Sequence, residues 1–207
     1  MPAREATAHM SWQDFVLTFV PLFIVIDAFG NIPFVITMGE DRTKPERRRM
    51  VHIAIITATI VGLIFLFFGQ FILNVMDISV GSFAIAGGVI LLVLSIKYMT
   101  SGHMVEMVSQ EMLAVVPIGT PLTVGPATIT TLILLALQYE IYIVLISFAV
   151  NMIITWVIFL LSQRIAALLG EGGIRAVSRV FSLLLAAIAV SMVIKGLALI
   201  GVINMPA

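Results

Sequence analysis

Six long apolar segments follow one another along the chain, separated by short polar connections. They cover residues 15–39, 51–76, 80–100, 112–137, 140–162 and 178–203. Each is long enough to cross a membrane as a helix, which takes about 20 mostly apolar residues. Their apolar residues are continuous, whereas the strands of a membrane barrel alternate apolar and polar positions. The pattern therefore predicts six transmembrane helices joined by loops at 40–50, 77–79, 101–111, 138–139 and 163–177.

The composition is that of an integral membrane protein. Of the 207 residues 61% are apolar and 11% are charged, and the mean hydropathy is +1.18. A soluble domain is about half apolar and a quarter charged, so a soluble enzyme is excluded. The 11 basic residues only balance the 11 acidic ones, and no excess positive charge is left to hold a nucleic acid. Membrane lipid is the expected surrounding partner.

Sequence motifs for catalysis and metal binding are missing from the chain. It contains no cysteine and only three dispersed histidines, so it offers neither disulfides nor a grouped set of metal ligands. Walker A, dinucleotide-binding, G-x-S-x-G and H-E-x-x-H motifs are also missing. We therefore expect neither an enzyme nor an ATP-driven pump, no cofactor and no metal site.

The basic residues predict the orientation of the chain in the membrane. They concentrate in the loop 40–50, at the end of the third segment and around 163–177, at Arg42, Lys44, Arg47, Arg48, Arg49, Lys97, Arg164, Arg175 and Arg179. In a six-helix arrangement all of these positions lie on one side, and Lys and Arg accumulate on the cytoplasmic side. Both termini of this multi-pass protein of the cell (inner) membrane are therefore predicted to lie outside the cytoplasm.

A Pro- and Gly-containing motif recurs at about half the chain length. Residues 27–33 (DAFGNIP) and 125–131 (GPATITT) are separated by about 96–98 residues. Each half contains three segments, and this odd number gives the second half the opposite orientation, as in the inverted repeats of secondary transporters. We expect an all-α membrane protein with one domain, 1–207, built from a first repeat at about 11–105 and a second at about 111–203.

The first segment is predicted to be a broken helix. Pro33 has no backbone N–H and its ring clashes with the carbonyl of Phe29, Gly30 lets the chain turn, and Asn31 is a good N-cap. One helix should end near Phe29 and another should begin near Ile32.

The fourth segment repeats this logic. Pro117 and Pro121 disturb its first part, Gly125 can turn, and Pro126 suits the first position of a new half-helix. Broken backbone inside a membrane is tolerated only where protein or a water-filled cavity covers it. The two breaks therefore point to one shared central site.

The chemistry at the breaks favours a zwitterionic ligand. A new half-helix presents free N–H groups and a partial positive charge, which suit a carboxylate, near Asn31 and Pro126. Asp27 could bind a cation or an ammonium group, because a carboxylate inside a membrane segment is costly and by default functional. The candidate substrate- and ion-binding residues are Asp27, Gly30, Asn31, Pro33, Thr123, Gly125, Pro126, Thr128, Thr130, Thr131 and Asn151.

Several of these motifs resemble those of the MarC family of inner-membrane proteins. The resemblance rests on 27–33, the Arg47–Arg49 run, Ala86-Gly87-Gly88 and 121–131, and it extends from about Trp12 to Ile203. The family usually has Pro after the aspartate, where this chain has Ala28. The resemblance implies six spans and membership of a neutral amino-acid transporter group.

Taken together, these features predict a secondary transporter, an exporter or exchanger, of small neutral amino acids. H⁺ or Na⁺ is the possible coupling ion. Two alternatives remain: a channel, which would not need a coupling carboxylate, and a membrane protein that does not transport at all.

Overall fold

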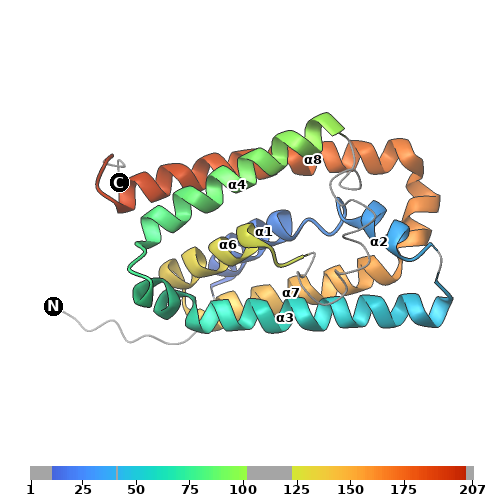
Figure 1. The fold of residues 1–207 in the computed structure, drawn as a ribbon, viewed down its shortest axis with the longest axis horizontal. Helices are drawn as coiled ribbons and strands as arrows, with labels where there is room; N and C mark the ends of the chain where they lie inside the picture. Colours follow the sequence, from blue (N-terminus) through green and yellow to red (C-terminus); the bar gives the residue numbers. More distant parts are fainter. Residues whose placement is uncertain (1–10, 41, 102–122, 204–207) are drawn as a thin grey trace.

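The computed structural model describes residues 11–40, 42–101 and 123–203, and within these ranges the chain is all-helical, with no strand (Figure 1). The helices are α1 (Trp12–Ile26), α2 (Ile32–Met38), α3 (Lys44–Val75), α4 (Val80–Ser101), α6 (Pro126–Gln138), α7 (Ile141–Leu160) and α8 (Ser162–Leu199). In the described ranges, four helical stretches are long and apolar enough to cross a membrane: Lys44–Val75, Val80–Lys97, Ile141–Leu160 and Gly172–Leu199. Trp12–Ile26 and Ala127–Gln138 are shorter apolar helices.

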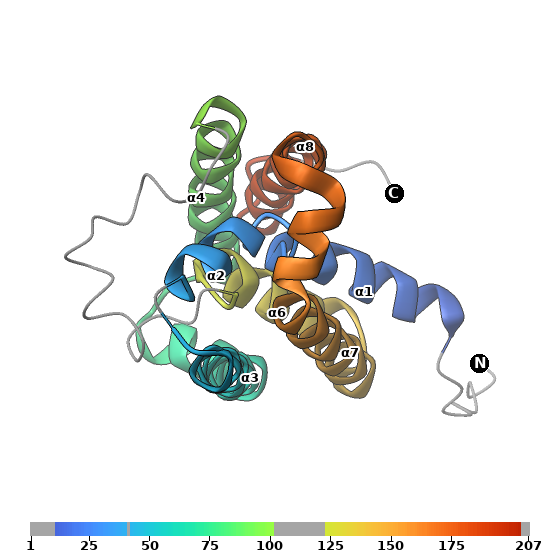
Figure 2. The same cartoon turned by 90° about the vertical axis from the view of Figure 1, so that its right-hand side faces the viewer.

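The helices pack around a central pair. Figure 1 and Figure 2 show α1 and α6 between the α4–α8 pair on one side and α3 and α7 on the other. A large apolar cluster joins α1, α2, α3, α6 and α7, with Leu22, Leu132 and Phe148 fully buried in it. A smaller cluster, containing Ala84 and Ala189, joins α4 and α8 to the central pair. The central helices therefore have protein on both sides.

Two predicted loops are helical in the structure. α3 begins at Lys44, inside the predicted loop 40–50, because the Glu46 carboxylate accepts hydrogen bonds from the backbone N–H and the hydroxyl of Thr43 and so caps the helix. The predicted loop 163–177 belongs to α8. Only Gly170 departs from helical geometry there, with φ 64°, so the backbone kinks and then resumes the helix. The first half of the predicted fourth segment, 112–122, lies outside the described residues.

α4 and α8 approach each other through glycines. A Cβ at Gly196 would lie 2.7 Å from the carbonyl oxygen of Gly81 and 2.7 Å from Ile85 Cγ1, and a Cβ at Gly88 would lie 2.7 Å from the carbonyl oxygen of Ala189. Real Cβ atoms do not come this close to backbone oxygens. Small residues of this kind let membrane helices pack backbone to backbone.

We expect Gly196→Ala to destabilise the protein by about 1–3 kcal/mol, the usual effect of overpacking a tight contact. Gly172→Ala, in the same helix, is the matched control, because a Cβ at Gly172 has nothing within 4 Å. It should be neutral or stabilising by up to about 1 kcal/mol, since alanine is the better helix former. Thermal unfolding of both variants in detergent checks the pair, and equal midpoints would contradict this packing.

Candidate functional site

The predicted break in the first segment is present. α2 begins at Ile32, as predicted. α1 ends at Ile26, three residues earlier than the predicted end near Phe29. Asp27 takes a left-handed conformation, φ 45° and ψ 56°, and its N–H still donates to the carbonyl of Phe23 at 3.3 Å. Aspartate and asparagine enter this region more readily than other non-glycine residues. The break is therefore made by Asp27 itself as well as by Pro33.

The Asp27 carboxylate is buried inside this break, with 4% of the residue exposed. Its Oδ1 accepts a hydrogen bond from the backbone N–H of Gly30 at 3.0 Å. A Cβ at Gly30 would overlap the carboxylate. Glycine is thus needed here for the close approach of the Asp27 side chain. Within the described part of the chain the carboxylate has this one neutral hydrogen bond, and a buried carboxylate so poorly compensated favours a cationic partner.

Asn31 holds the end of α1. Its side-chain N–H groups donate to the carbonyls of Ile26 at 3.1 Å and Asp27 at 3.0 Å, and it makes no N-cap hydrogen bond to α2. Asn31 therefore occupies the predicted N-cap position of α2, but its side chain bonds backward to α1 instead of capping α2. Only the amide nitrogen can donate these two hydrogen bonds, so the other terminal atom of the amide is the oxygen Oδ1. In the described part of the chain this Oδ1 is buried and has no partner, and an unpaired buried acceptor is costly.

The second break begins α6 as expected. Gly125 is at the N-cap position, Pro126 follows in the first turn, and Thr128 Oγ1 donates to the carbonyl of Thr123 at 3.0 Å. Both threonines are buried. Gly125 has extended backbone, φ −85° and ψ −175°, so no special glycine turn is used there. Pro117 and Pro121 lie outside the described residues.

The two breaks border the same apolar cluster. Ala28 and Ile32 from the first break and Val124 from the second are all buried in the large cluster. Thr130 and Thr131 point elsewhere. Gly87 of α4 lies so close to Thr130 that an added Cβ would be 2.5 Å from its Oγ1, while the Thr131 hydroxyl donates to its own helix and lies 3.9 Å from Met192 Sδ of α8. Thr130 therefore packs against α4, and Thr131 lies near α8.

Asn151 lies away from the breaks, between α1 and α7. Its N–H₂ donates to the carbonyls of Phe19 at 3.2 Å and Ser147 at 2.8 Å, and its Oδ1 is buried without a partner in the described part of the chain. Phe19 precedes Asp27 by eight residues, or about 12 Å along a helix. The predicted site therefore divides into two places along α1, one at the break and one near Phe19.

Thr18 and Ser147 are polar residues that the sequence interpretation missed. Their hydroxyl oxygens lie 2.7 Å apart across α1 and α7, and both residues are fully buried. One signal was available, because Ser147, Asn151 and Thr155 are spaced four apart and so share one face of a helix.

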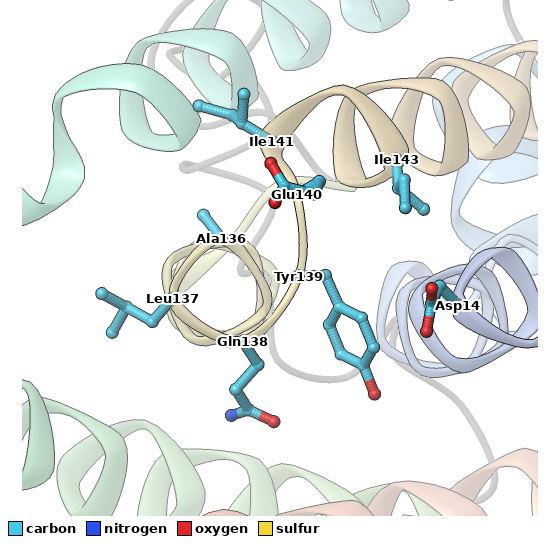
Figure 3. Close-up of a pocket in the computed structure, with 8 residues that line it drawn as sticks. All are labelled: Asp14, Ala136, Leu137, Gln138, Tyr139, Glu140, Ile141 and Ile143. Carbon is cyan, nitrogen blue, oxygen red and sulfur yellow. The ribbon is translucent and has the colours of Figure 1, made fainter. Parts of the chain in front are cut away.

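A pocket of about 530 Å³ opens at one end of the bundle, beside the start of α1 (Figure 3). Asp14 of α1 lines it together with residues from the end of α6 and the start of α7, among them Tyr139, Glu140 and Ile143. Asp14 and Ile143 each lie one helical turn before Thr18 and Ser147. The pocket therefore lies about one helical turn from the buried Thr18–Ser147 pair.

Known proteins similar to this chain cover almost its whole length. The UPF0056 membrane protein MJ1677 of Methanocaldococcus jannaschii is 31% identical over 200 residues, which cover 91% of this chain and 98% of that protein. The UPF0056 inner membrane protein YhgN of Escherichia coli K12 is 31% identical over 191 residues, covering 89% and 96%. UPF0056 membrane protein BU449 of Buchnera aphidicola is 31% identical over 188 residues, covering 89% and 96%. No solved structure matches the chain significantly.

The family comparison agrees with these relatives. The model of the MarC family integral membrane proteins matches residues 12–200, which include both breaks and all the described helices. The relatives' names describe membrane proteins, in one case an inner membrane protein, and none of the three names a substrate. The match includes every described helix, and the chain belongs to the MarC family of integral membrane proteins.

Proposed function

We propose that this protein is a secondary transporter, an exporter or exchanger, that moves small neutral amino acids across the membrane. One observation carries the proposal: at a helix break, the buried Asp27 carboxylate stands four residues from a buried amide oxygen, Asn31 Oδ1, that has no partner in the described part of the chain. Buried acceptors of this kind are expected to be paired, so a missing hydrogen-bond donor is the simplest account. The ammonium group of an amino acid supplies three N–H donors and a positive charge.

The second break supplies the complementary half of the site. α6 has 13 residues, and the backbone N–H groups of its first turn have no partners within the helix. Such groups favour a carboxylate. α2 has only seven residues, so the proposal assigns the substrate carboxylate to α6 alone and not to both half-helices. An ammonium group at Asp27 and a carboxylate at α6 describe a zwitterion without net charge.

The packing of the helices supports an inverted repeat within this proposal. Exchanging α1 with α6, α3 with α7 and α4 with α8 converts the α1–α7 contact into the α3–α6 contact. The α4–α8, α1–α6 and α3–α7 contacts each map onto themselves. This is the relation that a pseudo-two-fold axis in the membrane plane produces. A transporter of this plan would alternate access to one central site, and we propose six spans on that basis.

The orientation proposed from the basic residues predicts a C-terminus outside the cytoplasm. A reporter active only in the periplasm, fused after Ala207, should therefore be active, and a reporter active only in the cytoplasm should not. The cytoplasmic ends would then carry the start of α3, with Arg47–Arg49, and the kinked part of α8, with Arg164. The opposite pair of reporter results would contradict the six-span proposal.

Flux through the purified protein in liposomes tests the function. Each neutral amino acid is offered as a radiolabelled substrate to liposomes loaded with the same unlabelled compound. We expect accelerated exchange of small members of the set, and net accumulation when a gradient of H⁺ or Na⁺ is imposed. Flux that never exceeds the imposed gradient would favour a channel, and no flux of any amino acid would favour a membrane protein that does not transport.

A further inference from the structure

Four buried polar side chains lie in a row between α1 and α7, about 12 Å along α1 from the Asp27 break. They are Thr18, Ser147, Asn151 and Thr155, here called the α1–α7 polar row, and none is more than 2% exposed. Three of them follow one face of α7, and Thr18 of α1 forms a hydrogen bond with one of these, Ser147. The protein therefore shields these polar side chains from both lipid and water.

The hydrogen-bond donors of this row are already engaged. Both side-chain protons of Asn151 go to carbonyls of Phe19 and Ser147, and the Thr155 hydroxyl donates to the carbonyl of Asn151 at 2.8 Å. The Thr18 hydroxyl lies 2.9 Å from the carbonyl of Asp14 and 2.7 Å from Ser147 Oγ. Each hydroxyl has a single proton, and these protons have acceptors close by.

The acceptors of the row, in contrast, outnumber its donors. Asn151 Oδ1 is buried and has no partner in the described part of the chain. One mutual hydrogen bond between Thr18 and Ser147 leaves unused lone pairs on both hydroxyl oxygens. Pro21 has no N–H for the carbonyl of Leu17, so α1 carries one more carbonyl without its helical partner next to Thr18. An excess of neutral oxygen acceptors suits a cation and does not suit an anion.

A negatively charged entrance adjoins the row. The pocket in Figure 3 is lined by the carboxylates of Asp14 and Glu140, and Asp14 lies one helical turn before Thr18. Lys195 Nζ lies 3.4 Å from Oε1 of Gln138, which lines the pocket, and contributes one positive charge. Among the described residues at this pocket, two carboxylates against one ammonium group favour cations.

We propose that Asn151 Oδ1, together with the hydroxyl oxygens of Thr18 and Ser147, binds a sodium ion that enters through the pocket at Asp14 and Glu140. Neutral hydroxyl, amide and backbone oxygens are suitable ligands for a dehydrated monovalent cation. The ion lies apart from the amino-acid site at Asp27. Its role in coupling rests on the proposed transport function, whereas its binding does not.

Thermal unfolding of the full-length protein in lipid nanodiscs tests this site with Na⁺ alone and no amino acid. NaCl is exchanged stepwise for KCl or choline chloride at constant ionic strength. We expect the unfolding midpoint to rise and saturate with Na⁺ and to stay flat with the other two salts, because only a bound ligand stabilises the folded state in this way. A buried water molecule in place of the ion would give no difference between the salts, and that result overturns the proposal.

Two variants connect the effect to the row. Asn151→Leu and Ser147→Ala should each abolish the Na⁺-dependent rise, the second being the milder change if the first fails to fold. Asn74→Leu and Ser191→Ala are the matched controls, since Asn74 and Ser191 are exposed on α3 and α8, and both should retain the rise. Retention of the rise in Ser147→Ala and Asn151→Leu overturns the site. Na⁺ stabilisation without amino-acid flux would overturn the transport function alone.

Discussion

Replacing Asp27 by asparagine is expected to lower amino-acid flux by at least about 30-fold while leaving the fold in place. Removing one partner of a buried charge pair costs about 2–5 kcal/mol, and each 1.4 kcal/mol is a factor of ten. Asparagine tolerates the left-handed backbone of this position, φ 45°, and its Oδ1 can still accept from the N–H of Gly30. The variant therefore removes the charge and little else. Exchange in liposomes, with the unfolding midpoint measured in parallel, checks the result.

Asp77→Asn is the matched control for Asp27. Asp77 also has a left-handed backbone, φ 56°, just beyond the end of α3, but it is exposed. We expect its flux to equal that of the original protein. Equal flux in both variants would remove Asp27 from the site, and an unfolded Asp27→Asn protein would mean that the carboxylate has a structural role.

Gly30→Ala is expected to reduce flux strongly by displacing the Asp27 carboxylate. The backbone of Gly30 lies outside the left-handed region, so alanine is not strained there, but its Cβ would overlap the Asp27 side chain. The carboxylate must then leave the Gly30 N–H that holds it at 3.0 Å. We expect at least a tenfold loss of flux, together with about 1–3 kcal/mol of destabilisation from overpacking.

Gly125→Ala provides the comparison at the second break. A Cβ at Gly125 has nothing within 4 Å, and its extended backbone accepts any residue. The change should cost at most about 1 kcal/mol, because alanine is a poorer N-cap than glycine. If Gly30→Ala and Gly125→Ala behaved alike in the flux assay, the position of the Asp27 carboxylate would not matter for transport.

The sequence predicted the places where the chain breaks better than the contacts made there. Pro33 and Pro126 mark the starts of α2 and α6 because proline is favoured in the first turn of a helix. The end of α1 at Ile26 depends on the left-handed turn of Asp27 and on the hydrogen bonds that Asn31 donates backward. A local pattern does not reveal such backward bonds, since an asparagine before a helix more often caps that helix.

Local sequence patterns were also a poor guide to helix boundaries and to contacts between helices. The spacing of Thr43 and Glu46 is a capping signal from which the start of α3 could have been predicted. The glycines near 170–173 and the charges around them read as a loop, yet only Gly170 leaves the helix. The Thr18–Ser147 contact joins residues 129 positions apart, and no local pattern carries that information.

Cross-linking between the two breaks tests most directly whether they form one site. The chain has no native cysteine, so Ala28→Cys with Val124→Cys places two thiols in the same apolar cluster. Ala28→Cys with Ala84→Cys is the control, because Ala84 is buried in the other cluster. A short bifunctional reagent should join the first pair and not the second, and a transported amino acid should slow the reaction. Equal cross-linking of both pairs, or a rate that no transported amino acid changes, would contradict a shared substrate site at the two helix breaks.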